Sequence, residues 1–261
     1  LVLDPVERDG GRAGEVLEGT HAADAATLAR HFDAAGQPAR AARYALQAGL
    51  AAKQVYAHIE ARLLFDQALG LLAKEADGLR EPQAMAENRR WRIQALSERG
   101  WVLRLLGDMD AYARDLDEEA RLVSTLDDPR MLAHLRWQQA SAHLWFCRYR
   151  EARAAAEEGQ QLAQRVGDTY LEAMCWRASG LAARERGDLE QAQTALATAL
   201  RLFGALDQAA LRVHTLGNLS TLADYCGDYA QARALAQQAL AICEAANLWT
   251  ERRIALGDLG V

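Results

Sequence analysis

The chain has 261 residues, a mass of 28.7 kDa and a net charge of −6 at pH 7. This acidic balance argues against direct nucleic-acid binding by the segment, because contacts with phosphates need a basic face. No stretch approaches the roughly 18 apolar residues of a membrane span, and no signal segment is present, so we expect a cytoplasmic chain that binds no membrane.

The first part of the chain predicts an entry segment followed by helices. Residues 1–20 contain one proline and four glycines, which break any long helix and predict a linker. Residues 21–75 show helical spacing of apolar residues, with helices expected from about 22 to 34, 39 to 52 and 58 to 72. A polar interruption with Gly78 and Pro82 predicts a connector over 76–90, which we interpret as a loop.

From residue 91 onward the sequence repeats itself every 40 residues. The markers of the period are Gly107, Cys147, Gly187 and Gly227. Apolar residues at helical spacing on both sides of each marker predict two helices joined by a tight turn, in which glycine closes the first helix and aspartate caps the second. The expected helices run over 84–106, 109–126, 130–146, 149–166, 169–186, 189–204, 208–226, 229–246 and 249–261.

The residues at fixed places in this unit carry a resemblance to a known repeat. One copy has Gly180, Gly187, Leu189, Ala192, Leu196 and Ala199, and the next has Leu219, Gly227, Tyr229, Ala232 and Ala239. This pattern resembles the tetratricopeptide repeat (TPR), although the unit is longer than the usual ~34 residues and lacks the closing proline. The resemblance implies an all-α, TPR-like right-handed superhelical solenoid of antiparallel helix pairs, with four repeats and the first helix of a truncated fifth over 91–261.

A second resemblance concerns the parent protein. The segment ARHFDAAGQPARAARYALQAGLAA, followed by EARLLFDQALGLL, resembles the start of the helical-repeat sensor region in bacterial signal-transduction ATPases of the STAND class and in LuxR-type transcriptional regulators. The repeats from Trp91 onward resemble the same regions. We therefore expect the chain to be a piece of a longer bacterial regulator.

Motifs for chemistry are missing from the sequence. There is no P-loop, HExxH or GxSxG pattern, and we expect no enzyme, no cofactor and no metal site. The four cysteines lack CxxC spacing and favour reduced, partly buried thiols. An acidic run from Asp108 to Glu119 lacks the glycine and terminal glutamate of a calcium loop, so we interpret it as a solvated helix face.

The concave side of a TPR array, lined by the first helix of each pair, is where we expect binding. The positions predicted to face it carry tryptophan, arginine, histidine and tyrosine, the residue types that anchor interfaces. These candidates are Trp101, Arg104, His134, Trp137, Ser141, Trp145, Arg177, Arg184, His214, Asp224 and Tyr225. Tryptophans at helical spacing also fill cores, and helix arginines commonly pair with acids, so Trp101, Trp145, Arg177 and Arg184 each keep a structural alternative.

The sequence thus predicts a non-enzymatic region for protein interaction or effector sensing. Its expected partners are a protein or peptide, or a small effector, together with neighbouring domains of the parent chain. The positions that hold a terminal carboxylate in chaperone-tail clamps of this fold carry Ser97, Trp137, Arg177 and Gly217 here, which argues against that binding mode. The alternative function is a structural scaffold that mediates self-association without a ligand.

Overall fold

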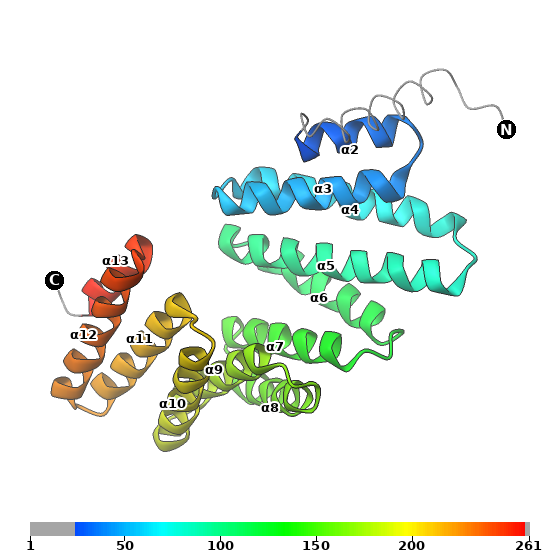
Figure 1. Ribbon diagram of the computed structural model, residues 1–261. Helices are drawn as coiled ribbons and strands as arrows, with labels where there is room; N and C mark the ends of the chain where they lie inside the picture. The colour runs from blue at the N-terminus through cyan, green and yellow to red at the C-terminus, as the bar shows by residue number, and fades with distance from the viewer. Residues whose placement is uncertain (1–23, 259–261) are drawn as a thin grey trace. The chain divides into compact units, whose positions relative to one another are not determined.

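The computed structural model describes residues 24–258, so the expected linker over 1–20 and the last three residues lie outside the described part. Between residues 24 and 258 the secondary structure consists of twelve α-helices and contains no strand (Figure 1). The chain divides into two compact units between Asp127 and Asp128. This boundary lies inside the segment that the 40-residue period treats as one array, and each unit is described here by itself.

Unit 1 is a stack of five helices that pack against their neighbours in chain order. They are α2 (Ala25–Ala34), α3 (Pro38–Gln54), α4 (His58–Gly78), α5 (Pro82–Leu106) and α6 (Met109–Val123). Helix α2 begins where the Asp24 carboxylate accepts a hydrogen bond from the Thr27 backbone N–H, and α5 has Pro82 in its first turn, where its missing N–H costs nothing.

The segment 76–90 is mostly helical, so the expected loop is confined to Leu79–Glu81. Asn88 stabilises the N-terminal part of α5, which lies within this segment. Its buried side-chain amide donates hydrogen bonds to the Leu72 carbonyl at 2.9 Å and to the Glu75 carboxylate at 2.8 Å. A polar residue in this stretch therefore ties α5 to α4 instead of facing water.

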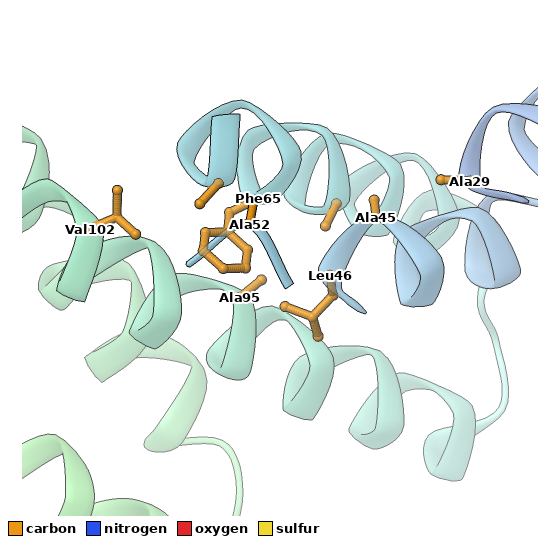
Figure 2. Packing of buried hydrophobic residues seen from close by; sticks show 9 residues of the cluster. Ala29, Ala45, Leu46, Ala52, Phe65, Ala95 and Val102 are labelled. Carbon is orange, nitrogen blue, oxygen red and sulfur yellow. The ribbon is translucent and has the colours of Figure 1, made fainter. Parts of the chain in front are cut away.

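The core of unit 1 is built around Phe65 of α4, which is fully buried among alanines, Leu46 and Val102 (Figure 2). Gly49 of α3 allows the two helices to approach, because a Cβ at this position would lie 2.5 Å from the Phe65 ring. Small residues on one helix thus accommodate a large ring on the next, the usual way for close-packed helices to interlock.

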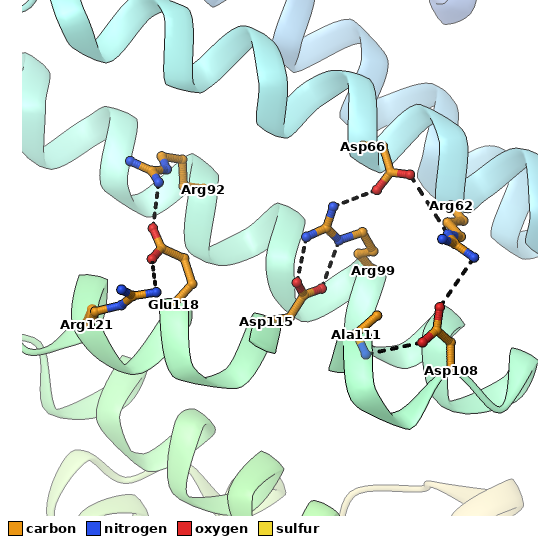
Figure 3. A network of polar contacts seen from close by, with 9 residues as sticks. All are labelled: Arg62, Asp66, Arg92, Arg99, Asp108, Ala111, Asp115, Glu118 and Arg121. Carbon is orange, nitrogen blue, oxygen red and sulfur yellow. Dashed lines mark hydrogen bonds and ion pairs between the residues drawn. The ribbon is translucent and has the colours of Figure 1, made fainter. Parts of the chain in front are cut away.

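A polar network joins α4, α5 and α6 (Figure 3). Arg99 donates to both carboxylate oxygens of Asp115 and, at 2.6 Å, to Asp66. Asp115 and Glu119 are buried, and Glu119 accepts a hydrogen bond from the Ser97 hydroxyl at 2.9 Å. The interpretation of the whole acidic run as a solvated face is therefore wrong for these two residues, because half-buried side chains of α5 donate hydrogen bonds to them.

Unit 2 consists of seven helices in the same alternation. They are α7 (Pro129–Trp145), α8 (Tyr149–Val166), α9 (Thr169–Glu185), α10 (Leu189–Ala205), α11 (Ala209–Tyr225), α12 (Tyr229–Ala246) and α13 (Trp249–Asp258). Most boundaries agree with the sequence prediction to within one or two residues. Within each unit, antiparallel helix pairs stack as expected for a helical-repeat solenoid (Figure 1).

The turns follow the predicted glycine–aspartate chemistry. Gly187 and Gly227 have φ values of 80° and 76°, in the left-handed region that glycine adopts without strain. Asp228 accepts a hydrogen bond from the Gln231 N–H and so caps α12. Asp188 makes no such capping bond, and its carboxylate lies 3.5 Å from Arg186 Nε and 4.0 Å from Arg153.

The small residues of the repeat lie where helices touch. A Cβ at Gly180 of α9 would lie 2.8 Å from Leu196 Cγ of α10, and a Cβ at Gly159 of α8 would lie 2.9 Å from Cys175 Sγ of α9. In the described part of the chain no helix has an apolar stretch long enough to cross a membrane.

Candidate binding surface

The two kinds of helix in unit 2 occupy different places in the stack. The backbones of the first helices α7, α9, α11 and α13 approach one another in sequence, whereas α8 and α10 are joined through side chains, as by the hydrogen bond from Arg153 to Gln191. We call the side of α7, α9 and α11 that carries His134, Trp137, Arg177 and His214 the inner face. Nine of the eleven predicted candidates belong to these three helices, and Trp101 and Arg104 belong to unit 1.

The candidates of α7 form a continuous row. His134 and Trp137 are half-buried, with ring centroids 5.3 Å apart in an edge-to-face arrangement. Trp137 also packs against the core cluster of Met174 and Phe203, so part of its ring serves the core. His134 Nδ1 also lies 3.1 Å from the side-chain amide of Gln138. Ser141 donates a hydrogen bond to the Trp137 carbonyl, and Trp145 at the end of the helix is 63% exposed. Trp145 is therefore not a core residue.

The centre of the inner face is Arg177 of α9, which is half-buried. Its positive charge acts on two neighbours, Tyr170 in the first turn of α9 and His214 on α11. Burial lowers the pKa of His214 below its usual value, and Arg177 adds to this shift while Glu251 of α13 opposes it. Burial likewise raises the pKa of Tyr170. The charge of Arg177 thus acts on a tyrosine of its own helix and on a histidine of the next first helix.

Three candidates lie near the ends of their helices. Arg184 of α9 donates two hydrogen bonds to the Glu185 carboxylate, at 2.7 and 3.0 Å, so it pairs with an acid as the structural alternative expects, although its side chain is largely buried. Asp224 and Tyr225 close α11 and are exposed, Tyr225 to 67%. Asp224 and Tyr225 therefore add no buried contact to the inner face.

The two candidates in unit 1 mainly contact other side chains of the same unit. Trp101 packs against the Phe65 cluster, and its ring centroid lies 5.6 Å from that of His58. The Lys53 ammonium lies 4.7 Å from the centroid of the Trp101 ring. The guanidinium of Arg104 lies 5.5 Å from the ring centroid of the buried Tyr112. The surroundings of Trp101 are therefore those of a core residue rather than those of a residue that lines an open groove.

A pocket that the sequence prediction missed lies on the other side of α9. It has a volume of about 420 Å³ and is lined by residues of α8, α9 and α10. Ser179 and Ala183, two of its lining residues, lie on the side of α9 roughly opposite Arg177 and Leu181, as the 100° rotation per residue requires. The prediction missed it because it considered only the positions expected to face the concave side.

In the described part of the chain, no group of three or more histidine, cysteine, aspartate or glutamate side chains is arranged to hold a metal ion. All four cysteines are free thiols, with Cys175 and Cys243 buried and Cys147 and Cys226 exposed. The arrangement on the inner face is one that suits contact with a ligand or partner.

The chain matches no protein-family model and no curated protein by sequence. Its fold is similar to solved structures of helical-repeat proteins. A STAND protein with a tetratricopeptide repeat sensor from Pyrococcus horikoshii is 15% identical with a TM-score of 0.58, over 98% of this chain and 43% of that one. TPR-like repeats of a putative kinesin light chain from Podosopora anserina are 16% identical with a TM-score of 0.58, over 80% and 97% of the two chains. A Rap protein complexed with Competence and Sporulation Factor is 12% identical with a TM-score of 0.58, over 82% and 68%. These likenesses concern the fold, and they agree with the TPR-like expectation.

Proposed function

From the TPR-like fold of the chain, we propose that it is a non-enzymatic region for protein interaction and effector sensing in a bacterial signalling or transcriptional regulator. The single observation that carries this function is the row of half-buried polar and aromatic side chains on the inner face of unit 2. Two pairs of such side chains support the proposal: His134 and Trp137 of α7 lie edge to face, and Arg177 of α9 acts electrostatically on His214 of α11. Half-buried aromatic and arginine residues are the types that anchor partners.

The comparisons support the same class of function without naming the partner. The Rap protein was solved in a complex with Competence and Sporulation Factor, and the STAND protein carries its repeats as a sensor. For this chain we propose a protein or peptide partner, or a small effector, on the inner face of unit 2. Occupancy would change how the helix pairs pack and so affect neighbouring domains of the parent chain, which requires that the ligand binds two packing states with different affinities.

The test uses charge reversal on the inner face with a matched change elsewhere. Arg177→Glu changes the centre of the row, and Arg201→Glu makes the same change at an exposed position of the second helix α10. The protein, purified from its native host, is analysed by native mass spectrometry for a bound species. We expect the wild type and Arg201→Glu to retain that species and Arg177→Glu to lose it while keeping its helical circular dichroism.

Two results count against this proposal. One is a bound species that both variants retain equally, since the inner face would then not be its site. The other is a wild-type protein without any bound species from either the native or a foreign host. If Arg177→Glu loses helicity, Asp224→Arg at the exposed end of α11 serves as the second inner-face variant.

A second candidate function is a scaffold that self-associates without a ligand. Large aromatic side chains are exposed at two turns of unit 2, with Trp145 at 63%, Tyr225 at 67% and Tyr229 at 73%. Exposed rings of this size favour association between copies. Sedimentation of the wild type beside Trp145→Ser and Tyr229→Ser separates the alternatives, because a scaffold would lose its oligomer in these variants and a ligand-binding monomer would not change.

A further inference from the structure

The pocket of unit 2 lies between the second helices α8 and α10, and α9 forms its floor. Arg153 and Glu157 come from α8, Trp176 and Ser179 from α9, and Glu190 from α10. Its volume of about 420 Å³ is within the range of roughly 300–1,000 Å³ typical of small-molecule sites. The site therefore has the size to hold a small organic group.

The repeat itself explains why this pocket is open. One period later, 40 residues along the chain, the positions of Gln160, Ser179 and Ala195 are occupied by leucines. These are Leu200, Leu219 and Leu235, which pack into the apolar clusters between α10, α11 and α12. At these three positions the pocket repeat carries smaller or polar residues where the next repeat carries leucine.

The polar groups of the pocket leave negative charge unbalanced. Arg153 is the single cation of the lining, and its guanidinium already donates to the Glu157 carboxylate and to the Gln191 side chain, each at 2.7 Å. Glu190 makes no ion pair with any described residue. With two carboxylates against one engaged guanidinium, the lining favours a cation over an anion.

Two further side chains suit an organic cation. The Trp176 ring packs against the core cluster of Met174 and Phe203 and also lines the pocket. An aromatic ring beside a carboxylate attracts ammonium and guanidinium groups. Ser179 is only 8% exposed, and its hydroxyl has no hydrogen bond to another described residue. A buried hydroxyl open to the pocket offers an acceptor to an N–H donor.

We propose that this pocket binds an alkyl guanidinium or alkyl ammonium group, with the cation near Glu190 and the aliphatic part against Trp176 and Ala195. Such a group is carried by free small amines and guanidines and by arginine or lysine side chains of a polypeptide. The site is distinct from the inner face, because Ser179 and Ala183 of its lining lie on the side of α9 roughly opposite Arg177. It does not rest on the function proposed above.

The first test measures binding of agmatine by isothermal titration calorimetry to the wild type and to two variants. Ala195→Leu fills the pocket with the side chain that the next repeat accommodates at Leu235, and we expect it to weaken binding by at least roughly tenfold. Glu190→Gln removes the unpaired charge at an exposed position, and we expect a loss of about fivefold. Matched controls are Ala197→Leu and Glu151→Gln, which change exposed residues outside the lining and should leave binding unchanged.

The second arm identifies the source of the cation. A short blocked peptide with one arginine among alanines is titrated beside agmatine. Tighter binding of the peptide, weakened by Ala195→Leu, assigns the site to a polypeptide side chain, and equal or weaker binding assigns it to a free small cation. The proposal is overturned if neither probe binds, or if agmatine binds Ala195→Leu and Glu190→Gln as tightly as the wild type. These results leave the Arg177→Glu experiment unaffected, so the two proposals fail separately.

Discussion

The guanidinium of Arg99 and the carboxylate of Asp115 are joined by two parallel hydrogen bonds of 2.6 and 2.8 Å across α5 and α6. Asp115 is only 6% exposed, so removing Arg99 would leave a buried carboxylate without its main partner. We expect Arg99→Ala to lower the free energy of unfolding by about 3 kcal/mol. Arg121→Ala removes an exposed arginine that pairs with Glu118, and it should cost less than about 1 kcal/mol. Urea unfolding followed by circular dichroism measures both, and equal effects would contradict a special role for the buried pair.

Two glycines within helices give opposite expectations for the same substitution. Gly180 faces Leu196, whose backbone nitrogen would lie 3.2 Å from an added Cβ, whereas nothing lies within 4 Å of a Cβ at Gly70. Gly180→Ala should therefore destabilise the protein by about 1–3 kcal/mol through overpacking. Gly70→Ala should stabilise it by about 0.5–1 kcal/mol, because alanine favours the helix. Thermal unfolding of the two variants decides the question, and a stabilised Gly180→Ala would mean that α9 and α10 are not in close contact.

The four cysteines should divide into two reactivity classes. Burial raises the pKa of Cys175 to about 12 and raises that of Cys243, so neither side chain forms thiolate near neutral pH in the folded protein. Cys147 and Cys226 are exposed. A brief treatment of the native protein with iodoacetamide should modify these two, and all four should react in denaturant. Mass spectrometry of peptides identifies the sites, and rapid native labelling of Cys175 would contradict the packing of α8 against α9.

Acid should weaken unit 2 through two histidines. Burial lowers the folded-state pKa of His143 and of His214 below the ordinary value of 6.5. The unfolded chain then binds more protons as the pH falls through 6.5, so this contribution to stability is present above that pH and is lost below it. We expect a lower urea midpoint at about pH 5.5 than at about pH 7.5, with a smaller difference in the His143→Gln, His214→Gln double variant. An undiminished difference in that variant would assign the effect to other groups.

Much of the fold follows from the sequence because its signals are local and repeated. Gly187 and Gly227 mark turns that need a left-handed residue, and Gly180 marks a close helix contact, so period and residue type were enough to predict them. Cys147 stands at the same turn position with φ 56°, which shows that the repeat geometry persists without glycine there. The division near Asp127 was not predictable from the period, because it depends on how many contacts cross each turn.

The polar interior of unit 1 was not predicted, because charge alone does not show which acids find a partner. Asp115 and Glu119 look like surface residues until Arg99 and Ser97 of α5 are placed beside them. A signal was present, since both acids share the face of α6 that carries the buried Tyr112 and Leu116. Such a face favours burial whatever the charge.

The surroundings of the candidate side chains could be predicted only in part. Spacing placed Trp137, Arg177 and His214 on first helices, but whether a tryptophan is buried depends on the neighbouring helix. Trp101 packs on a core cluster and Trp145 does not. The pocket of unit 2 between α8, α9 and α10 could have been predicted by comparing the repeats position by position. Ser179 and Leu219 occupy the same place in the period and differ in size.

Every substantial helix contact within each unit joins elements at most two places apart along the chain. Within the described residues of each unit, no substantial contact joins the first helix to the last one, unlike in a closed sheet or a knotted core. Pulled from both ends, unit 2 should lengthen by releasing one helix pair after another, each at a modest force, and should shorten again when the tension falls. The stack of repeats should therefore extend elastically at low force and transmit small displacements along its length.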